Sequence, residues 1–383
     1  MLSVPDVYAS SDLTELAEFC RHLFSSFARS DQRRWAEVYV RGLDCVPGRK
    51  SIRRISEQVV GWPADQSLQQ FLNQSPWRWE PVRRLLAQDM AAVLRPRAWT
   101  VEEVVFPKNG SHSVGVAKQY AHSAGRVLNC QLGLAVLMAG QEGACPVNWR
   151  LLLPRSWDDD ARRRAVTHVP AHERARSRWQ HLLDALDEMA AWELAAAPVL
   201  VDARQNRRVE QLIRGLEERG LRYLVQVDEH TPLGPGPCRT AGEIAAAVTG
   251  PSAQTLNWWH GHGRVTFRST PVSLHGSLPQ GPGMPYEIGR SRARVLAEWG
   301  PGRQAPGRLW LTNITQARLP DLIGLIGLRE RARGDLTRVG EECGLRHFEG
   351  RSYRGWHHHV TLVSVAHAFH LLGSLRSEAD RSA

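Results

Sequence analysis

Arginine is the residue type in this sequence with the clearest capacity for chemistry. The chain has 383 residues, with 49 Lys+Arg against 39 Asp+Glu, a formal net charge of +10 and a pI near 9.8. Only Lys50, Lys108 and Lys118 are lysines, which leaves 46 arginines (49 − 3). A guanidinium fork binds a phosphate through two donors at once. The charge balance therefore favours a nucleic-acid partner, although a GC-rich genome is an alternative source of the arginine excess.

The segment from Arg49 to Arg95 carries eight basic and four acidic residues. The stretch RKSIRRISEQVV is basic and amphipathic, ends at Gly61-Trp62-Pro63, and is followed by SLQQFLNQS. A helix, a glycine-containing turn and a second helix form the layout of a helix-turn-helix. We predict DNA contacts here, with a solvated helical bundle as the alternative. The residues proposed for these contacts are Arg49, Lys50, Arg53 and Arg54.

Basic residues elsewhere extend the expected DNA-binding surface. Lys108 stands in the turn Lys108-Asn109-Gly110, where its ammonium could contact a phosphate. Arg329, Arg351 and Arg354 belong to an arginine-rich strip near the C-terminus. A solvated helix surface is the alternative interpretation of this strip.

Two clusters resemble metal sites only in composition. His357, His358 and His359 would point about 100° apart on a helix and so could not converge on one ion. We expect one histidine in the core and two on the surface. The run of three aspartates from Asp158 to Asp160 is expected to form the first turn of a helix, where the helix dipole favours acids.

The elements that position these residues follow from the hydrophobic period. Residues 12–95 read as helices, whereas 99–106, 113–120, 130–140 and 147–154 read as strands of an antiparallel meander. Helices follow, one opening at residues 157–160 and one through 179–197, and then a strand at 198–203, a helix at 207–220 and a strand at 221–227. This order predicts an α/β, ribonuclease-H-like mixed sheet.

The expected domains are a helical DNA-binding domain at 1–95 and a ribonuclease-H-like core whose first part covers 96–227. A β-rich insertion at 228–315, C-terminal core helices at 316–376 and a tail at 377–383 complete the division. The six cysteines form no CxxC pair, and no apolar run is long enough to span a bilayer. We therefore expect a cytoplasmic, nucleoid-associated protein with no membrane partner.

Several longer motifs identify a family resemblance. KNGSHSVGVAKQY, LLLPRSWDDDARRR and GLRHFEGRSYRGWHHHVTLVSVAHAF are similar to segments of DDE transposases of the insertion sequence 701 family. The resemblance implies a ribonuclease-H-like core with a β-rich insertion before the last catalytic acid. It also implies DNA cleavage and strand transfer with two magnesium ions, which three carboxylates would hold.

The family's catalytic positions are only partly acidic in this chain. Glu102 stands where the resemblance places the first Asp, and Asp202 in VLVDARQN matches the second. The third position, a Glu in the family, is Arg333, which cannot coordinate a cation. Glu330 lies one helical turn earlier and is the candidate substitute. If any metal binds, Glu102 and Asp202 are the expected ligands.

The sequence therefore favours a transposase-derived, sequence-specific DNA-binding protein that is domesticated and catalytically inactive. Its expected role is regulation, scaffolding or targeting on DNA. An active transposase and a protein-interaction module without DNA binding are the two alternatives. We expect no bound cofactor, or Mg²⁺ if the protein is active. Double-stranded DNA is the expected partner; a homodimer on DNA and further protein partners are left open.

Overall fold

The computed structural model describes residues 10–206, 208–233, 240–247, 254–260, 263–275 and 290–382. The chain forms two compact units. Unit 1 contains residues 1–96, 102–194 and 331–383, and unit 2 contains residues 97–101 and 195–330. Each unit is described separately below.

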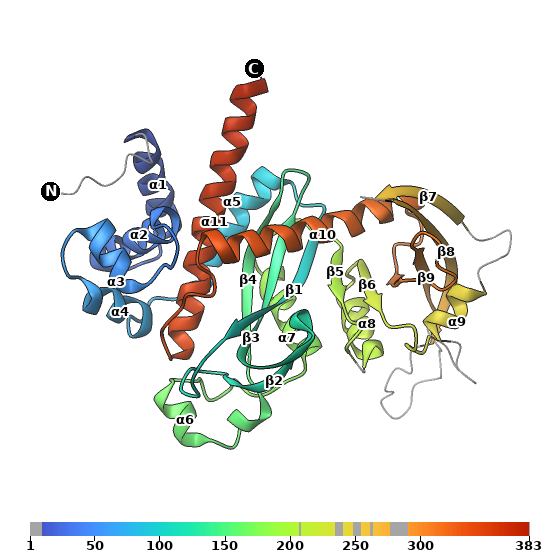
Figure 1. The fold of residues 1–383 in the computed structure, drawn as a ribbon, viewed down its shortest axis with the longest axis horizontal. Helices are drawn as coiled ribbons and strands as arrows, with labels where there is room; N and C mark the ends of the chain where they lie inside the picture. The colour runs from blue at the N-terminus through green and yellow to red at the C-terminus, as the bar shows by residue number, and fades with distance from the viewer. Residues whose placement is uncertain are drawn as a thin grey trace. The chain divides into compact units, whose positions relative to one another are not determined.

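The N-terminal part of unit 1 is helical, as its hydrophobic spacing predicts. On α4, Leu68, Phe71 and Leu72 are buried, and this face packs against α11. Helices α1 to α5 lie beside α11 in Figure 1. Their bounds are α1 (Ser10–Leu23), α2 (Ser30–Cys45), α3 (Ile52–Ile55), the π-helical turn η1 (Ser56–Val60), α4 (Asp65–Asn73), α5 (Trp79–Leu94) and α11 (Tyr353–Ser382). The residues expected as a tail, 377–383, thus include the end of α11.

Strands and short helices complete unit 1. The long strand β3 pairs antiparallel with β2 through residues 126–130 and with β4 through residues 132–139. The elements are β1 (Ala98–Pro107), β2 (Ala117–Ala121), η2 (His122–Ala124), β3 (Arg126–Ala139), β4 (Ala144–Leu152), η3 (Arg155–Trp157), α6 (Ala161–Val166) and α7 (Arg178–Ala190).

Three expectations about this region are wrong in detail. The expected strand 113–120 begins only at Ala117, and β3 rather than β2 lies beside β1, so β2 is an edge strand. Gly115, with φ +71°, takes a backbone conformation that turns the chain instead of extending it. Helix α7 ends at Ala190 rather than at residue 197.

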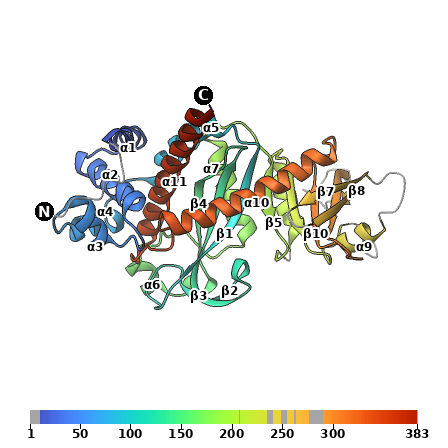
Figure 2. The same ribbon diagram turned by 45° about the horizontal axis from the view of Figure 1, so that its top comes forward.

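Unit 2 contains the parallel part of the sheet. The first residues of β1 pair with β5, and β5 pairs with β6, both in parallel. Strand β10 is antiparallel to β6, and β9, β8 and β7 continue the sheet with α9 packed beside β8 and β9 (Figure 2). The elements are β5 (Val199–Asp202), α8 (Val209–Glu218), β6 (Tyr223–Val227), α9 (Ala241–Ala246), β7 (Gln254–His260), β8 (Gly263–His275), β9 (Arg290–Trp299), β10 (Arg308–Thr312) and α10 (Leu319–Glu342). Helix α10 begins in unit 2 and ends in unit 1.

The strand order defines the fold class. The order β4-β3-β1-β5-β6, with β1, β5 and β6 parallel, is that of a ribonuclease-H-like mixed sheet, and the expected fold class is confirmed. Strands β7 to β10 lie in the segment expected to be a β-rich insertion, and they extend the same sheet. Parallel strands put their carboxyl ends on one edge of a sheet, which is where ligands bind in open α/β folds.

Candidate nucleic-acid interface

Asp202 is the last residue of β5 and so lies at the carboxyl edge of the parallel strands. The residue before it, Val201, pairs with Val101 of β1, which precedes Glu102. Asp202 itself pairs with Gln226 of β6. Asp202 therefore lies one residue beyond the last position at which β5 pairs with β1.

The carboxylate of Asp202 is held by Arg204. The Arg204 guanidinium donates from Nε to Oδ1 at 3.0 Å and from Nη2 to Oδ2 at 2.6 Å, and the Arg204 backbone N–H donates to Oδ1 at 3.1 Å. Burial alone would raise the pKa of Asp202. The hydrogen bonds and charge of Arg204, with the charge of Arg329, outweigh burial and hold that pKa below its ordinary value.

Arg329 comes from α10 and is buried. Its guanidinium lies 5.9 Å from the centre of the Trp310 ring and donates to Oε1 of Gln226 at 3.4 Å. It acts on Asp202 as a nearby positive charge. The structure therefore places this proposed DNA-binding residue in the interior of unit 2, away from solvent.

A second ion-pair cluster contains the candidate substitute ligand Glu330. Arg308 donates to both oxygens of Glu298 at 2.6 and 2.8 Å, and it also binds Glu330. The charge of Arg308 acts on Arg204, so the two clusters are electrostatically connected. Glu330 is thus engaged with Arg308 within unit 2.

These carboxylates do not fit a magnesium centre in the arrangement observed. Mg²⁺ needs oxygen ligands and a negative site, but Asp202, Glu298 and Glu330 are matched by Arg204, Arg308 and Arg329. Within the part of the chain that the structure describes, no three His, Cys, Asp or Glu residues form a group that could hold a metal ion.

Glu102 and Arg333, the other two positions that the family resemblance assigns to the catalytic set, belong to unit 1. Glu102 is buried, and its neighbour Glu103 forms an ion pair with Arg178 at 2.6 Å. Arg333 is exposed on α10, and its backbone carbonyl accepts a hydrogen bond from Thr337. The cation at the carboxylate of Asp202 is Arg204, two positions further along the chain.

The expected pair of helices is present in the N-terminal segment. Helix α3 continues into η1, which ends at Gly61 with φ +80°, and α4 begins at Asp65. Ser51 caps the N-terminus of α3, because its side chain accepts a hydrogen bond from the Arg54 backbone N–H. The Ser56 hydroxyl donates to the Trp62 carbonyl and accepts from the Ala64 backbone N–H, which fixes the connecting turn.

The basic residues proposed for DNA contact differ in what they do. Lys50 is buried and donates to backbone carbonyls at the end of α2. Lys108 donates to the Phe348 carbonyl at 2.7 Å, and burial lowers the pKa of its ammonium. Both lysines therefore stabilise the fold of unit 1.

The arginines proposed for DNA contact in unit 1 are exposed or half-buried. Arg53 is 79% exposed and pairs with Glu57 one turn along. Arg49 pairs with Glu349, and Arg54 donates to the Arg49 carbonyl. Arg351 is exposed, and the half-buried Arg354 donates to the Gln74 carbonyl at 3.1 Å.

The three consecutive histidines are all buried, so the expectation of two surface histidines is wrong. His358 stacks on Trp77 with ring centroids 3.6 Å apart. A hydrogen bond of 3.0 Å joins Nδ1 of His359 to the hydroxyl of Tyr39. All three are buried because α2, α4, α5 and β4 contact α11. Consecutive residues of a helix point about 100° apart, so the three rings face different neighbours.

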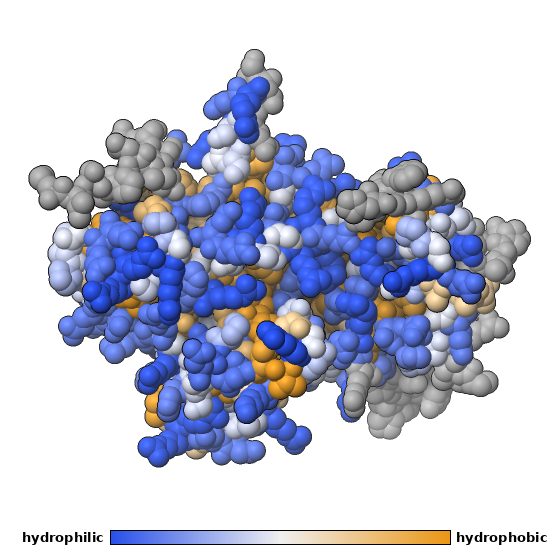
Figure 3. Space-filling model, in the orientation of Figure 1, coloured by the Kyte–Doolittle hydropathy of each residue, from blue (hydrophilic) through white to orange (hydrophobic). Residues whose placement is uncertain are grey.

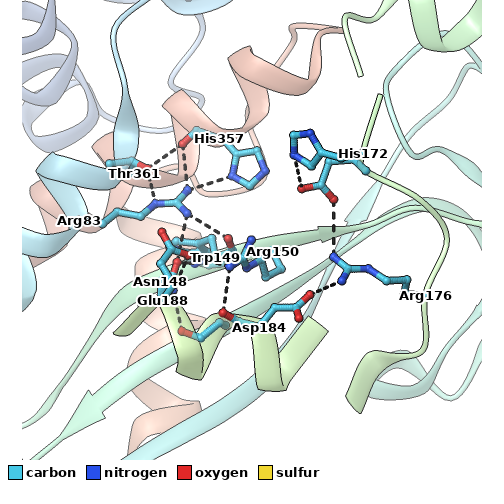
Figure 4. Close-up of polar contacts among 12 residues, drawn as sticks. Arg83, Asn148, Trp149, Arg150, His172, Arg176, Asp184, Glu188, His357 and Thr361 are labelled. Carbon is cyan, nitrogen blue, oxygen red and sulfur yellow. Dashed lines mark hydrogen bonds and ion pairs between the residues drawn. The ribbon is translucent and has the colours of Figure 1, made fainter. Parts of the chain in front are cut away.

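The charge cluster around Arg83 could not be predicted from local sequence. Arg83 on α5 is 1% exposed and donates to Thr361 at 2.8 Å, to the Trp149 carbonyl at 3.0 Å and to Nδ1 of His357 at 3.1 Å. It also donates to Asn148 at 3.2 Å (Figure 4). This guanidinium joins α5, β4 and α11 inside unit 1, and its only signal in the sequence is an arginine on the apolar side of a helix.

The fold and the carboxyl-edge site define a ribonuclease-H-like α/β protein. The sequence profile of the family described as DDE superfamily endonuclease matches residues 22–241, and the chain belongs to that family. Among solved structures, the piggyBac transposase in a synaptic complex with hairpin DNA is similar at 9% identity and a TM-score of 0.42. That match covers 97% of this chain and 74% of the other. No curated protein matches the sequence.

None of the helices in the described ranges has the length and apolar character needed to cross a membrane.

Proposed function

We propose that this protein is a transposase-derived DNA-binding member of the DDE superfamily endonuclease family that does not cut DNA. The finer ancestry proposed is the insertion sequence 701 group, with domestication to a regulatory, scaffolding or targeting role. The observation that carries the proposal is the double hydrogen bond from Arg204 to the carboxylate of Asp202.

An arginine in this position opposes metal binding in two ways. It occupies the oxygens of Asp202 that would ligate a cation, and its fixed positive charge repels that cation. Arg308 likewise forms ion pairs with the carboxylates of Glu298 and Glu330 and opposes metal binding there. The exposed Arg333 at the third family position supplies no ligand to replace them.

DNA binding is supported by the net charge and by the N-terminal helices. The formal charge of +10 favours a polyanion. In unit 1, Arg53 and Arg351 are exposed, and α3, η1 and α4 have the order of a helix-turn-helix. Hydrophilic side chains cover much of the N-terminal helices in the view of Figure 3.

The test measures binding and cleavage in the same reaction. Fluorescently labelled duplex, including DNA that flanks the coding region, is incubated with the protein in Mg²⁺ or Mn²⁺ and analysed on native and denaturing gels. We expect a shifted band and intact strands. The log–log salt slope should be about −4 to −5 for roughly five phosphate contacts.

A metal-dependent endonuclease is the second candidate, because the family description favours it. Nicking in Mn²⁺ that disappears in Asp202→Asn would establish this function and refute our proposal. A protein that neither binds nor cuts DNA would leave the protein-interaction alternative.

A further inference from the structure

Helix α4 presents a row of glutamines to solvent. Gln66, Gln69 and Gln70 are all exposed. Their spacing of i, i+3 and i+4 puts them on one helical face. The opposite face, with Leu68 and Phe71, is buried in unit 1.

These amides are available to a ligand. Within the described residues, the side chains of Gln66, Gln69 and Gln70 form no hydrogen bond and no ion pair with the rest of the chain. A solvated glutamine on a helix is common, but three neighbouring ones form a surface of donors and acceptors without net charge. Glutamine can bond the N6 amino group and N7 of adenine at the same time, which is the characteristic contact of this side chain in the major groove.

Cationic and aromatic side chains flank the glutamine row. In the turn before α4, Trp62 is 53% exposed, and the Arg34 guanidinium lies 5.7 Å from its ring. Arg53, on the helix packed beside α4, is exposed. Beyond the end of α4, Arg354 is held at the Gln74 carbonyl. A row of uncharged amides flanked by cations is complementary to duplex DNA, because the base edges of a duplex lie between two lines of phosphates.

We propose that α4 is the base-reading helix of this protein and that its Gln66, Gln69 and Gln70 select adenine in adenine–thymine pairs of the target. The inference rests on the proposed function, because it names what the DNA-binding helices recognise. In a helix-turn-helix the second helix lies in the major groove, and its N-terminal residues contact base edges. Gln66 is the second residue of the second helix, α4, and Gln69 and Gln70 lie at its middle.

The experiment selects binding sites from a randomised duplex library with the full-length chain. The wild type is compared with Gln69→Ala/Gln70→Ala and with Gln58→Ala, which removes an exposed glutamine from the preceding helical turn. We expect the wild type and Gln58→Ala to enrich one motif containing adenine–thymine pairs. The double variant should keep its affinity for random DNA and lose the preference at those pairs by about 5- to 150-fold for each contact.

A base analogue identifies the contact itself. Each selected adenine is replaced by 7-deazaadenine, which lacks the N7 acceptor. Wild-type affinity should fall, whereas the affinity of the double variant should not change further. An equal loss in both proteins would refute the contact.

The outcomes separate this inference from the function on which it rests. A protein that binds no duplex refutes both. A protein that binds duplex with a motif unchanged in the double variant, or with a motif of guanine–cytosine pairs only, refutes the role of α4 and leaves DNA binding intact. Circular dichroism and the thermal midpoint should not change in either variant, because all the substituted side chains are exposed.

Discussion

Acidification should unfold unit 1, because five of its histidines are buried in the neutral form. Burial lowers the pKa of His181, His358 and His359 to about 3 and that of His367 to about 4. It lowers the pKa of His357 well below the ordinary value, and the charge of Arg83 adds to the effect. At His358 two backbone carbonyls oppose this shift, but burial outweighs them.

The direction of the pH effect follows from proton counting. The unfolded chain takes up a proton at each histidine near pH 6.5. In the folded chain His181, His358, His359 and His367 do so only near pH 3 to 4, and the pKa of His357 lies well below its ordinary value. Stability is therefore complete above pH 6.5 and is lost as the pH falls toward the folded pKa values.

The size of the effect at pH 5 depends only on the unfolded pKa, because the folded values lie well below that pH. Each histidine lowers the free energy of unfolding by about 2 kcal/mol at pH 5. This value is the interval of about 1.5 pH units between the unfolded pKa and pH 5, multiplied by ~1.36 kcal/mol per unit. Five such groups remove roughly 10 kcal/mol, which is comparable with the whole stability of a typical domain.

Urea unfolding at pH 8.0, 6.5 and 5.5, followed by circular dichroism, measures this dependence. The free energy of unfolding should fall by about 6 kcal/mol per pH unit near pH 5.5. His181→Leu should weaken that dependence by about one fifth, since His181 is one of the five histidines. The substitution breaks no hydrogen bond among the described residues, because neither ring nitrogen of His181 has a partner there. His172→Gln is the control, because the His172 side chain is 81% exposed. A free energy that stays constant between pH 8.0 and 5.5 would refute the reasoning.

Three further predictions test the interior and the two charged regions. Arg83→Met should lower the free energy of unfolding by about 3 kcal/mol, because it leaves several buried acceptors without a donor; an unchanged urea midpoint would contradict this. Arg53→Glu/Arg54→Glu should reduce the magnitude of the salt slope of DNA binding by about 2, measured by fluorescence anisotropy, without changing the circular dichroism spectrum. An unaltered slope would exclude both side chains from the interface. Arg204→Ala should raise the pKa of Asp202, because burial remains when the side-chain hydrogen bonds and the charge of Arg204 are lost. Carbon-13 NMR titration of the carboxyl group checks this shift, and a pKa equal to that of the wild type would show that Arg204 does not hold the carboxylate.

The sequence alone determined the order of elements and therefore the fold class. Alternating and continuous apolar runs predict β1, β5 and β6, and Gly220 marks the end of α8, because these features depend on residues close together in the chain. The contact between Asp202 and Arg204 is also local, since the partners are two positions apart in the chain. The strand predicted at 198–203 is β5 (Val199–Asp202) in the structure, one residue shorter at each end.

Only the tertiary structure decided which charged side chains remain in solvent. Lys108 was expected to contact a phosphate, but it is half-buried and donates to the carbonyl of Phe348, which is 240 residues away in the chain. Arg83 and His357 meet across 274 residues. The domain boundaries and the roles of Glu102 and Arg333 stay predictions. Whether a cation faces water or a buried carbonyl depends on which distant segment packs over it, and local spacing carries no information about that packing.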